Sequence, residues 1–202
     1  MTDGSLRDRQ RAQIRSDIRR AAFRLFVERG YDTVTTEEIA TAAGVSPRTL
    51  FRHVPTKEEL LLAPVRHGGA AIVNLLEKRP ATEAPDVALI NAIITRTRSF
   101  DRADCEEWRA ALLVAPGLLD KATIHTPADK ERAMKLVAER MGANPDTDMR
   151  PGLLIHLAFG AADFAFQQWV RRSAPRRPLD RYVIEALEAV KSPYWRKRRS
   201  TA

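Results

Sequence analysis

The chain has 202 residues, of which 44% are hydrophobic and 30% are charged, and its formal net charge is +8. This length suffices for a small domain and a second, larger core, and the composition is that of a globular rather than a disordered protein. Cys105 is the only cysteine, which excludes an intrachain disulfide and a zinc site made of several thiolates.

No targeting or membrane-spanning segment is expected. Residues 1–17 contain no apolar core of the kind that a secretory signal needs. The most apolar run, residues 153–170, is interrupted by His156, Asp163 and two glutamines, so it is a poor membrane span. We therefore expect a cytoplasmic protein with no membrane partner.

The basic charge is concentrated at the C-terminus. Residues 171–202 carry 10 Lys and Arg against 3 Asp and Glu, whereas residues 1–60 carry 11 against 9. A basic balance is typical of proteins with a polyanionic partner. Residues 194–202 are expected to form a basic tail without regular structure.

The chain begins with a polar stretch and an amphipathic helix. Residues 1–12 are expected to form a mobile arm, with arginines at the alternate positions Arg7, Arg9 and Arg11. This arm is either simply solvated or lies in a minor groove of DNA. Apolar residues at helical spacing then predict a helix that ends at Gly30. They are Ile14, Ile18, Ala21, Ala22, Leu25 and Phe26.

Residues 35–54 predict two short helices joined by a tight turn. Thr35 and Glu38 have the spacing of a capping box, and Gly44 can adopt the left-handed conformation that ends a helix. Ser46 begins the second helix as its N-cap, with proline at the first helical position. The layout is that of a DNA-binding helix-turn-helix, although a helical hairpin within an all-α domain would have the same punctuation.

The second of these helices carries the residue types that contact DNA. Leu50 is placed to face the core. The polar side chains on its other faces are Arg48, Thr49, Arg52 and His53. Because such side chains donate hydrogen bonds to both phosphates and base edges, they favour DNA binding over a purely structural hairpin.

Residues 14–60 resemble the N-terminal domain of the TetR family of bacterial transcriptional regulators. The matching residues are Phe26 to Tyr31, Thr35, Thr36, Ile39, Ala40, Ala43 to Ser46, Thr49 to Phe51, His53 and Lys57 to Leu60. The chain departs from the common family residues at Arg48, Phe51 and Val54, and Phe51 lacks the hydroxyl group that the more common tyrosine offers to a phosphate.

The resemblance implies an all-α protein with two domains. A three-helix DNA-binding domain would occupy residues 1–56, and a larger effector-binding and dimerisation domain would occupy residues 79–193. The residues that the resemblance assigns to DNA binding are Thr36, Pro47, Arg48, Thr49, Phe51, Arg52, His53 and Lys57.

Residues 57–78 are expected to form a connecting helix that is kinked or broken near Pro64. A proline inside a helix removes one hydrogen bond, here to the Leu60 carbonyl, and its ring clashes with that carbonyl. Gly68 and Gly69 weaken the following turn further.

The last two long helices are predicted near residues 149–172 and 179–191. The first of them is apolar nearly all round, so it must be buried on several sides. In the TetR family the last two helices pair with those of a second subunit, and the resemblance therefore implies a homodimer. The alternative is that these helices only complete the core of a monomer.

The effector is expected to be a small, mainly apolar molecule held in a pocket of the second domain. Arg96 and Arg109 are candidate anchors for an anionic end, since a buried guanidinium needs a partner. The other candidate pocket residues, each of which could also be ordinary core, are Val73, Ile93, Phe100, Trp108, Leu112, Met134, His156 and Phe159. This domain resembles those of actinobacterial TetR regulators that sense acyl-CoA-like molecules.

The sequence thus predicts a repressor that binds a palindromic DNA operator as a dimer and is released by its effector. The alternative is a ligand-independent, structural DNA-binding protein. The sequence contains no dinucleotide-binding, P-loop, H-E-x-x-H or G-x-S-x-G motif, so we expect no enzymatic activity, cofactor or metal site.

Overall fold

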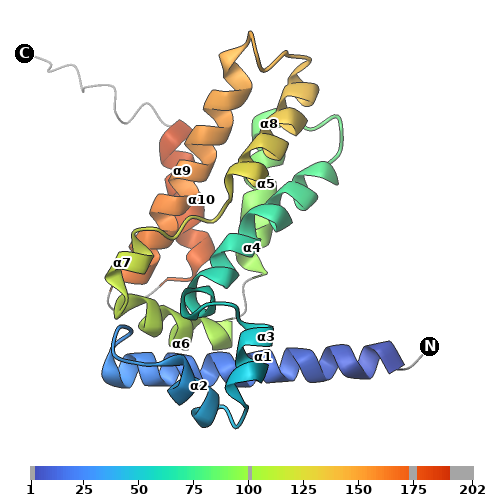
Figure 1. The fold of residues 1–202 in the computed structure, drawn as a ribbon. Coiled ribbons are helices and arrows are strands. Elements are labelled where there is room, and N and C mark those ends of the chain that lie inside the picture. Colours follow the sequence, from blue (N-terminus) through green and yellow to red (C-terminus); the bar gives the residue numbers. More distant parts are fainter. Residues whose placement is uncertain (1–2, 100–101, 173–176, 192–202) are drawn as a thin grey trace, which may run out of the picture. The chain divides into compact units, whose positions relative to one another are not determined.

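The computed structural model describes residues 3–99, 102–172 and 177–191 (Figure 1). Within these ranges all regular structure is α-helical, which confirms the expected all-α class. The helices are α1 (Asp3–Arg29), α2 (Thr36–Ala42), α3 (Pro47–His53), α4 (Lys57–Glu77), α5 (Pro85–Arg98), α6 (Arg102–Leu113), α7 (Pro116–Leu119), α8 (Pro127–Met141), α9 (Met149–Arg171) and α10 (Leu179–Lys191). The tail at residues 194–202 lies outside the described residues.

The chain divides into two compact units. Unit 1 comprises Met1–Pro64 and Asp101–Ala122, and unit 2 comprises Val65–Phe100 and Thr123–Ala202. The division falls inside α4, directly after Pro64, rather than at residues 56 and 79 as the sequence indicates. Helices α6 and α7, which lie within the expected effector domain, are thus packed in unit 1.

A buried tryptophan explains why α6 belongs to unit 1. Trp108 is 2% exposed, and its indole Nε1–H donates a 2.8 Å hydrogen bond to the carbonyl of Leu61 in the first turns of α4. Leu112, one turn further along α6, is fully buried. Since α6 also packs against α1, removing it would expose a continuous apolar surface of unit 1.

Helix α1 begins earlier than the sequence indicates. The polar segment expected to be a mobile arm is helical from Asp3 onward. Farther along α1, Ile18, Ala22 and Phe26 are fully buried. Helices α2 and α3 both pack against α1. The segment expected to be an arm is therefore a helical extension of the helix that supports α2 and α3.

Helix α4 continues through Pro64 instead of breaking there. The Thr56 hydroxyl accepts the Glu59 backbone N–H at 3.2 Å and so caps its start. At its other end, the Arg140 guanidinium donates to the carbonyls of Leu76, Arg79 and Pro80 at 2.8 to 3.0 Å. These contacts hold the two ends of α4, whereas the hydrogen bond that Pro64 removes is lost from its interior.

Two glycines allow α4 to approach the segment before α8 in unit 2. A Cβ atom at position 69 would lie 2.5 Å from Asp129 Oδ2 and 2.8 Å from the Cα of His125. At position 68 it would lie 3.1 Å from the Ile124 carbonyl oxygen. The glycines that weaken the helix by propensity are thus required by its packing.

A half-buried acidic side chain fixes the segment before α8 to α9. Asp163 Oδ1 accepts the Ile124 backbone N–H at 2.8 Å, and its other oxygen lies 3.8 Å from His125 Nε2. The ring of Phe159 meets that of His125 edge-on, with centroids 4.7 Å apart. Burial raises the pKa of Asp163, although the Ile124 hydrogen bond and the nearby His125 act in the opposite direction.

No helix among the described residues is long and apolar enough to cross a membrane.

The raised pKa of Asp163 predicts a pH-dependent stability. A carboxyl group whose pKa is higher in the folded state stabilises the fold fully below its ordinary pKa of 3.8, and this contribution is lost as the pH rises through the folded value. Asp163→Asn keeps an acceptor for the Ile124 N–H and cannot ionise. Urea denaturation should show the wild type losing stability relative to this variant between pH 4 and pH 7, with Asp146→Asn, at an exposed loop position, as the control. A difference that does not change with pH would contradict the assignment.

Candidate functional site

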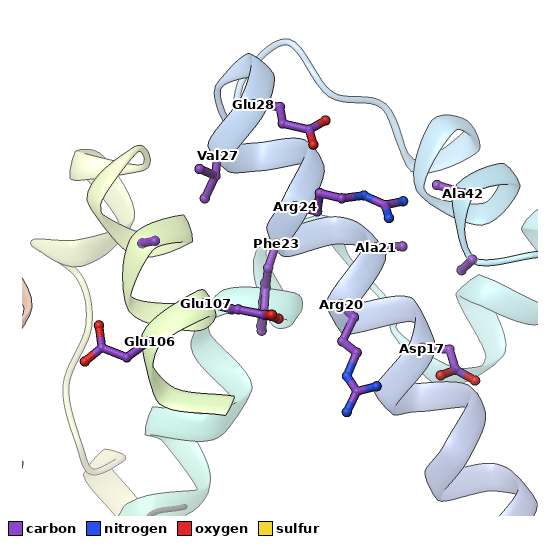
Figure 2. Close-up of a pocket in the computed structure, with 12 residues that line it drawn as sticks. Asp17, Arg20, Ala21, Phe23, Arg24, Val27, Glu28, Ala42, Glu106 and Glu107 are labelled. Atoms are coloured by element: carbon purple, nitrogen blue, oxygen red, sulfur yellow. The ribbon is translucent and has the colours of Figure 1, made fainter. Parts of the chain in front are cut away.

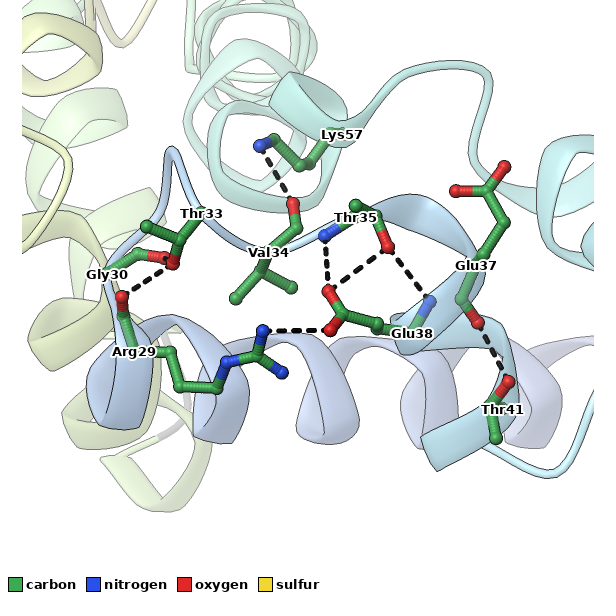
Figure 3. Close-up of polar contacts among 9 residues, drawn as sticks. All are labelled: Arg29, Gly30, Thr33, Val34, Thr35, Glu37, Glu38, Thr41 and Lys57. Atoms are coloured by element: carbon green, nitrogen blue, oxygen red, sulfur yellow. Dashed lines mark hydrogen bonds and ion pairs between the residues drawn. The ribbon is translucent and has the colours of Figure 1, made fainter.

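The two short helices have the caps that the sequence predicts. The Glu38 N–H donates to Thr35 Oγ1 at 3.2 Å, and the Thr35 N–H donates to Glu38 Oε2 at 2.8 Å, which completes the capping box (Figure 3). Gly44 has a φ of +67°, the left-handed conformation that the turn requires. Ser46 Oγ accepts the Thr49 N–H at 3.2 Å and begins α3.

The turn between α1 and α2 is fixed from both sides. Thr33 Oγ1 donates to the carbonyl of Arg29 at 2.6 Å, and the Arg29 guanidinium lies 2.8 Å from Glu38 Oε1. The Lys57 ammonium donates to the carbonyls of Tyr31 and Val34 at 2.8 and 3.0 Å. Figure 3 shows the contacts of Arg29, Thr33 and Lys57 around the segment that joins α1 to α2. Because three chain segments meet here, the orientation of α2 and α3 is set by polar contacts as well as by the core.

Lys57, which the family resemblance assigns to a phosphate, is therefore a structural contact of the turn. Besides its two carbonyl acceptors, its ammonium lies 4.3 Å from the centroid of the Tyr31 ring. An ammonium has three N–H donors, so one remains for a further acceptor.

Helix α3 presents a mixed face to solvent. Leu50 is fully buried. Pro47, Arg48, Phe51 and Arg52 are exposed. Phe51 is 46% exposed, which is unusual for an aromatic side chain and leaves its ring available to a partner. The half-buried Thr49 has its hydroxyl 3.0 Å from Ser46 Oγ.

His53 and Thr36 lie at the margins of this face. Thr36 is half-buried, and its hydroxyl donates to Glu37 Oε2 at 3.1 Å. Burial lowers the pKa of His53, and the positive charges of Arg52, Arg15 and Arg11 lower it further. In the protein without DNA, both effects favour the neutral form of His53.

Arg11 and Arg15 of α1 lie close enough to His53 for their charges to lower its pKa, so this part of α1 adjoins the end of α3. Sequence reasoning did not connect these residues with α3, because it treated the segment before Gln13 as an arm. The signal that could have found them is their spacing, since four-residue steps place Arg7, Arg11 and Arg15 on one side of a helix.

The residues expected to bind the effector are divided between the two units. Trp108, Arg109 and Leu112 are buried in unit 1. Those in unit 2 are the buried Val73, Ile93 and Phe159, the half-buried Arg96 and Met134, and the exposed His156. Phe100 lies outside the described residues. The structure therefore does not gather these candidates in one unit.

A cavity of about 740 Å³ opens in unit 1 between α1, the end of α2 and α6 (Figure 2). Its charged lining residues are Asp17, Arg20, Arg24, Glu28, Glu106 and Glu107. None of the residues expected to bind DNA or effector lines it. The described residues contain no group of three or more His, Cys, Asp or Glu side chains that could hold a metal ion.

Comparisons with protein families match both parts of the chain. The model described as bacterial regulatory proteins of the tetR family matches residues 18–63, and the model of the MftR C-terminal domain matches residues 83–194. The HTH-type transcriptional regulator TcmR of Streptomyces glaucescens is 32% identical over 179 residues, which cover 83% of this chain and 78% of that protein. The HTH-type transcriptional activator FasR of Mycolicibacterium smegmatis is 26% identical over 140 residues, or 67% and 62% of the two chains.

The fold is also found among solved structures. NalD of Pseudomonas aeruginosa, the secondary repressor of the MexAB-OprM multidrug efflux pump, superposes with a TM-score of 0.57. The two are 20% identical, and the match covers 90% of this chain and 96% of NalD. At this identity the likeness concerns the fold alone.

The contacts of Lys57 predict that it contributes to stability. Lys57→Ala removes two hydrogen bonds from a charged donor and leaves two backbone carbonyls without it, which should lower the free energy of unfolding by roughly 1–3 kcal/mol. Chemical denaturation followed by circular dichroism measures this change. Lys78→Ala, at an exposed position near the end of α4, should change it by less than ~0.5 kcal/mol. Equal stabilities of the two variants would show that the Lys57 contacts contribute nothing.

Proposed function

Because the chain belongs to the TetR family of bacterial transcriptional regulators, we propose that it is a ligand-responsive repressor that binds a palindromic operator as a homodimer and is released by a small, mainly apolar effector. The family consists of regulators rather than enzymes, and its members bind DNA. The observation that carries the proposal is the exposed face of α3, with its two arginines, on a scaffold fixed by the Lys57 and Glu38 contacts. The protein would act in the cytoplasm, where the DNA lies.

In the proposed complex α3 enters the major groove. Arg48, exposed in its first turn, and Thr49 would meet base edges. The exposed Phe51 ring and Pro47 would make apolar contacts with thymine methyl groups or sugars. Phosphates would be held by the other members of the assigned set, which are Thr36, Arg52, His53 and Lys57.

The proposed dimer uses an exposed apolar stripe on α9. Met149, Leu153, Leu157 and Phe164 are 79%, 55%, 45% and 59% exposed, and their spacing places them on one face of the helix. Gly160 lies on the same face, where a Cβ atom would meet nothing within 4 Å. Such a contiguous apolar stripe is characteristic of an interface, and a second copy of α9 and its neighbour α10 would bury it.

The proposed effector site lies in unit 2 among buried apolar side chains. Val73 of α4, Ile93 of α5 and Phe159 of α9 are fully buried and supply apolar surface. Helix α4 belongs to this unit after Pro64 and to the DNA-binding unit before it. An effector that prefers a different path of α4 would shift the population away from the DNA-binding state, and a tenfold to hundredfold change in affinity requires only ~1.4–2.8 kcal/mol of coupling.

DNA reading by α3 is tested on a duplex that the wild-type protein selects from random-sequence DNA. Arg48→Ala should weaken binding by roughly 1–3 kcal/mol and relax the preference at one base position, because a side chain at a base edge carries sequence information. Fluorescence anisotropy measures both effects. Arg132→Ala, which removes the same charge from an exposed position of α8, is the control. If Arg48→Ala and its control bind alike, α3 does not read the bases as proposed.

The dimer is tested by sedimentation at micromolar concentration. Phe164→Glu places a charge in the middle of the α9 stripe and should yield a helical monomer with weakened binding to the selected duplex, since burying an unpaired charge is costly. Val87→Glu introduces the same charge at an exposed apolar position of α5 and should leave the dimer intact. A monomeric wild type would refute this interface.

A further inference from the structure

In the first turns of α1, arginines occupy the side of the helix that is apolar and buried farther along the chain. That face is formed by Ile18, Ala22 and Phe26, which follow one another at intervals of four residues and are fully buried. Arg7, Arg11 and Arg15 have the same interval, and Arg15 stands three residues before Ile18. Intervals of three and four residues keep side chains on one side of a helix. The face that is apolar in the core of unit 1 therefore becomes basic in the part of α1 that extends beyond this core.

This basic face points to the side of α1 where α3 lies. Helix α3 packs against α1, and Figure 1 shows α1 running past α3 toward the N-terminus. Arg11 and Arg15 lie near enough to His53, the last residue of α3, for their charges to lower its pKa. Both arginines are exposed. Their guanidinium groups thus adjoin the DNA-reading helix without being part of it.

We propose that the N-terminal extension of α1 is a second DNA-binding element, which holds the phosphate backbone beside each operator half-site through Arg7, Arg11 and Arg15. This inference rests on the proposed function, because it needs DNA on the exposed face of α3. It replaces the minor-groove arm considered from the sequence, since a regular helix presents these arginines as a rigid row.

The chemistry of the row fits phosphates better than bases. From Arg7 to Arg15 the helix rises by about 12 Å, a length over which duplex DNA presents several phosphates. Asp8 is the only acidic residue between Leu6 and Ser16, so this part of the helix is strongly basic. Guanidinium groups bind phosphate oxygens in a bidentate manner, without regard to base identity.

The opposite side of α1 supplies a matched control. Arg20 and Arg24 are exposed and line the cavity that α1 forms with the end of α2 and with α6 (Figure 2). Arg20 follows Arg11, and Arg24 follows Arg15, by about two and a half helical turns, which places the two pairs on different sides of α1. Arg11→Ala/Arg15→Ala and Arg20→Ala/Arg24→Ala each remove two charges from the same helix. Alanine favours the helix in both variants, and circular dichroism verifies that α-helical content is unchanged.

The experiment measures anisotropy of the full-length proteins on the selected duplex, with flanks of either ten base pairs or none on each side. With flanks, Arg11→Ala/Arg15→Ala should bind about tenfold or more weakly than the wild type. The slope of log affinity against log salt should become shallower by about 0.9 for each phosphate that the variant no longer neutralises. Removing the flanks should weaken DNA binding by the wild type and by Arg20→Ala/Arg24→Ala, the cavity-side control. It should leave DNA binding by Arg11→Ala/Arg15→Ala, the α3-side variant, nearly unchanged. The effect should be the same for A·T-rich and G·C-rich flanks.

Three results would overturn the inference. The α3-side variant could match the wild type in affinity and salt slope, the cavity-side control could be weakened as much, or the weakening could occur only with A·T-rich flanks, which would indicate base reading in the minor groove. If the proposed function itself were wrong, the wild type would enrich no duplex from the random pool. This outcome is distinct from the three results above, all of which require a selected duplex.

Discussion

The Lys57 ammonium donates hydrogen bonds to the carbonyls of Tyr31 and Val34, in the turn that joins α1 to α2. Lys57 is also the first residue of α4. One side chain therefore ties the start of α4 to the loop that precedes α2. Backbone carbonyls in such a compact turn need partners, and here a charged donor supplies them. The position of α3, which follows α2 after a tight glycine turn, depends on this connection.

Helix α4, which begins at Lys57, belongs to both units. It continues through Pro64, where the chain divides into its two units, and its glycines at 68 and 69 permit the close approach of the segment before α8. The same segment is bound to α9 by the hydrogen bond between Ile124 and Asp163. A regulator that couples an effector to DNA needs a continuous element shared by both of its parts, and α4 has this property.

The local features of the fold were predictable from the sequence because they depend on residues close together in the chain. The capping box of Thr35 and Glu38, the left-handed Gly44 and the Ser46 cap all involve partners within a few residues. The place of α6 was not predictable in this way. It depends on the hydrogen bond from Trp108 to Leu61, whose partners are 47 residues apart, and the apolar pattern of α6 does not reveal which core it joins.

The candidate site shows the same limit. The exposed residues of α3 follow from helical periodicity around the buried Leu50, so the sequence identified them. The contacts of Lys57 with the turn could not be predicted in this way, because they join residues 26 and 23 positions apart in the chain. The helical start of α1 was not predicted because it has no apolar periodicity of its own. The position of its arginines beside His53 is a tertiary contact, which the sequence does not reveal.

The central claim is that two copies of α3 read a symmetric DNA sequence, and selection from random duplexes tests it most directly. The full-length protein is incubated with the pool, bound DNA is recovered, and the enriched sequences are determined over successive rounds. The account predicts an inverted repeat whose half-sites are separated by about one helical turn, or a multiple of it, as two-fold-related helix-turn-helix units require. Enrichment of a single asymmetric half-site, or of no sequence at all, would contradict it.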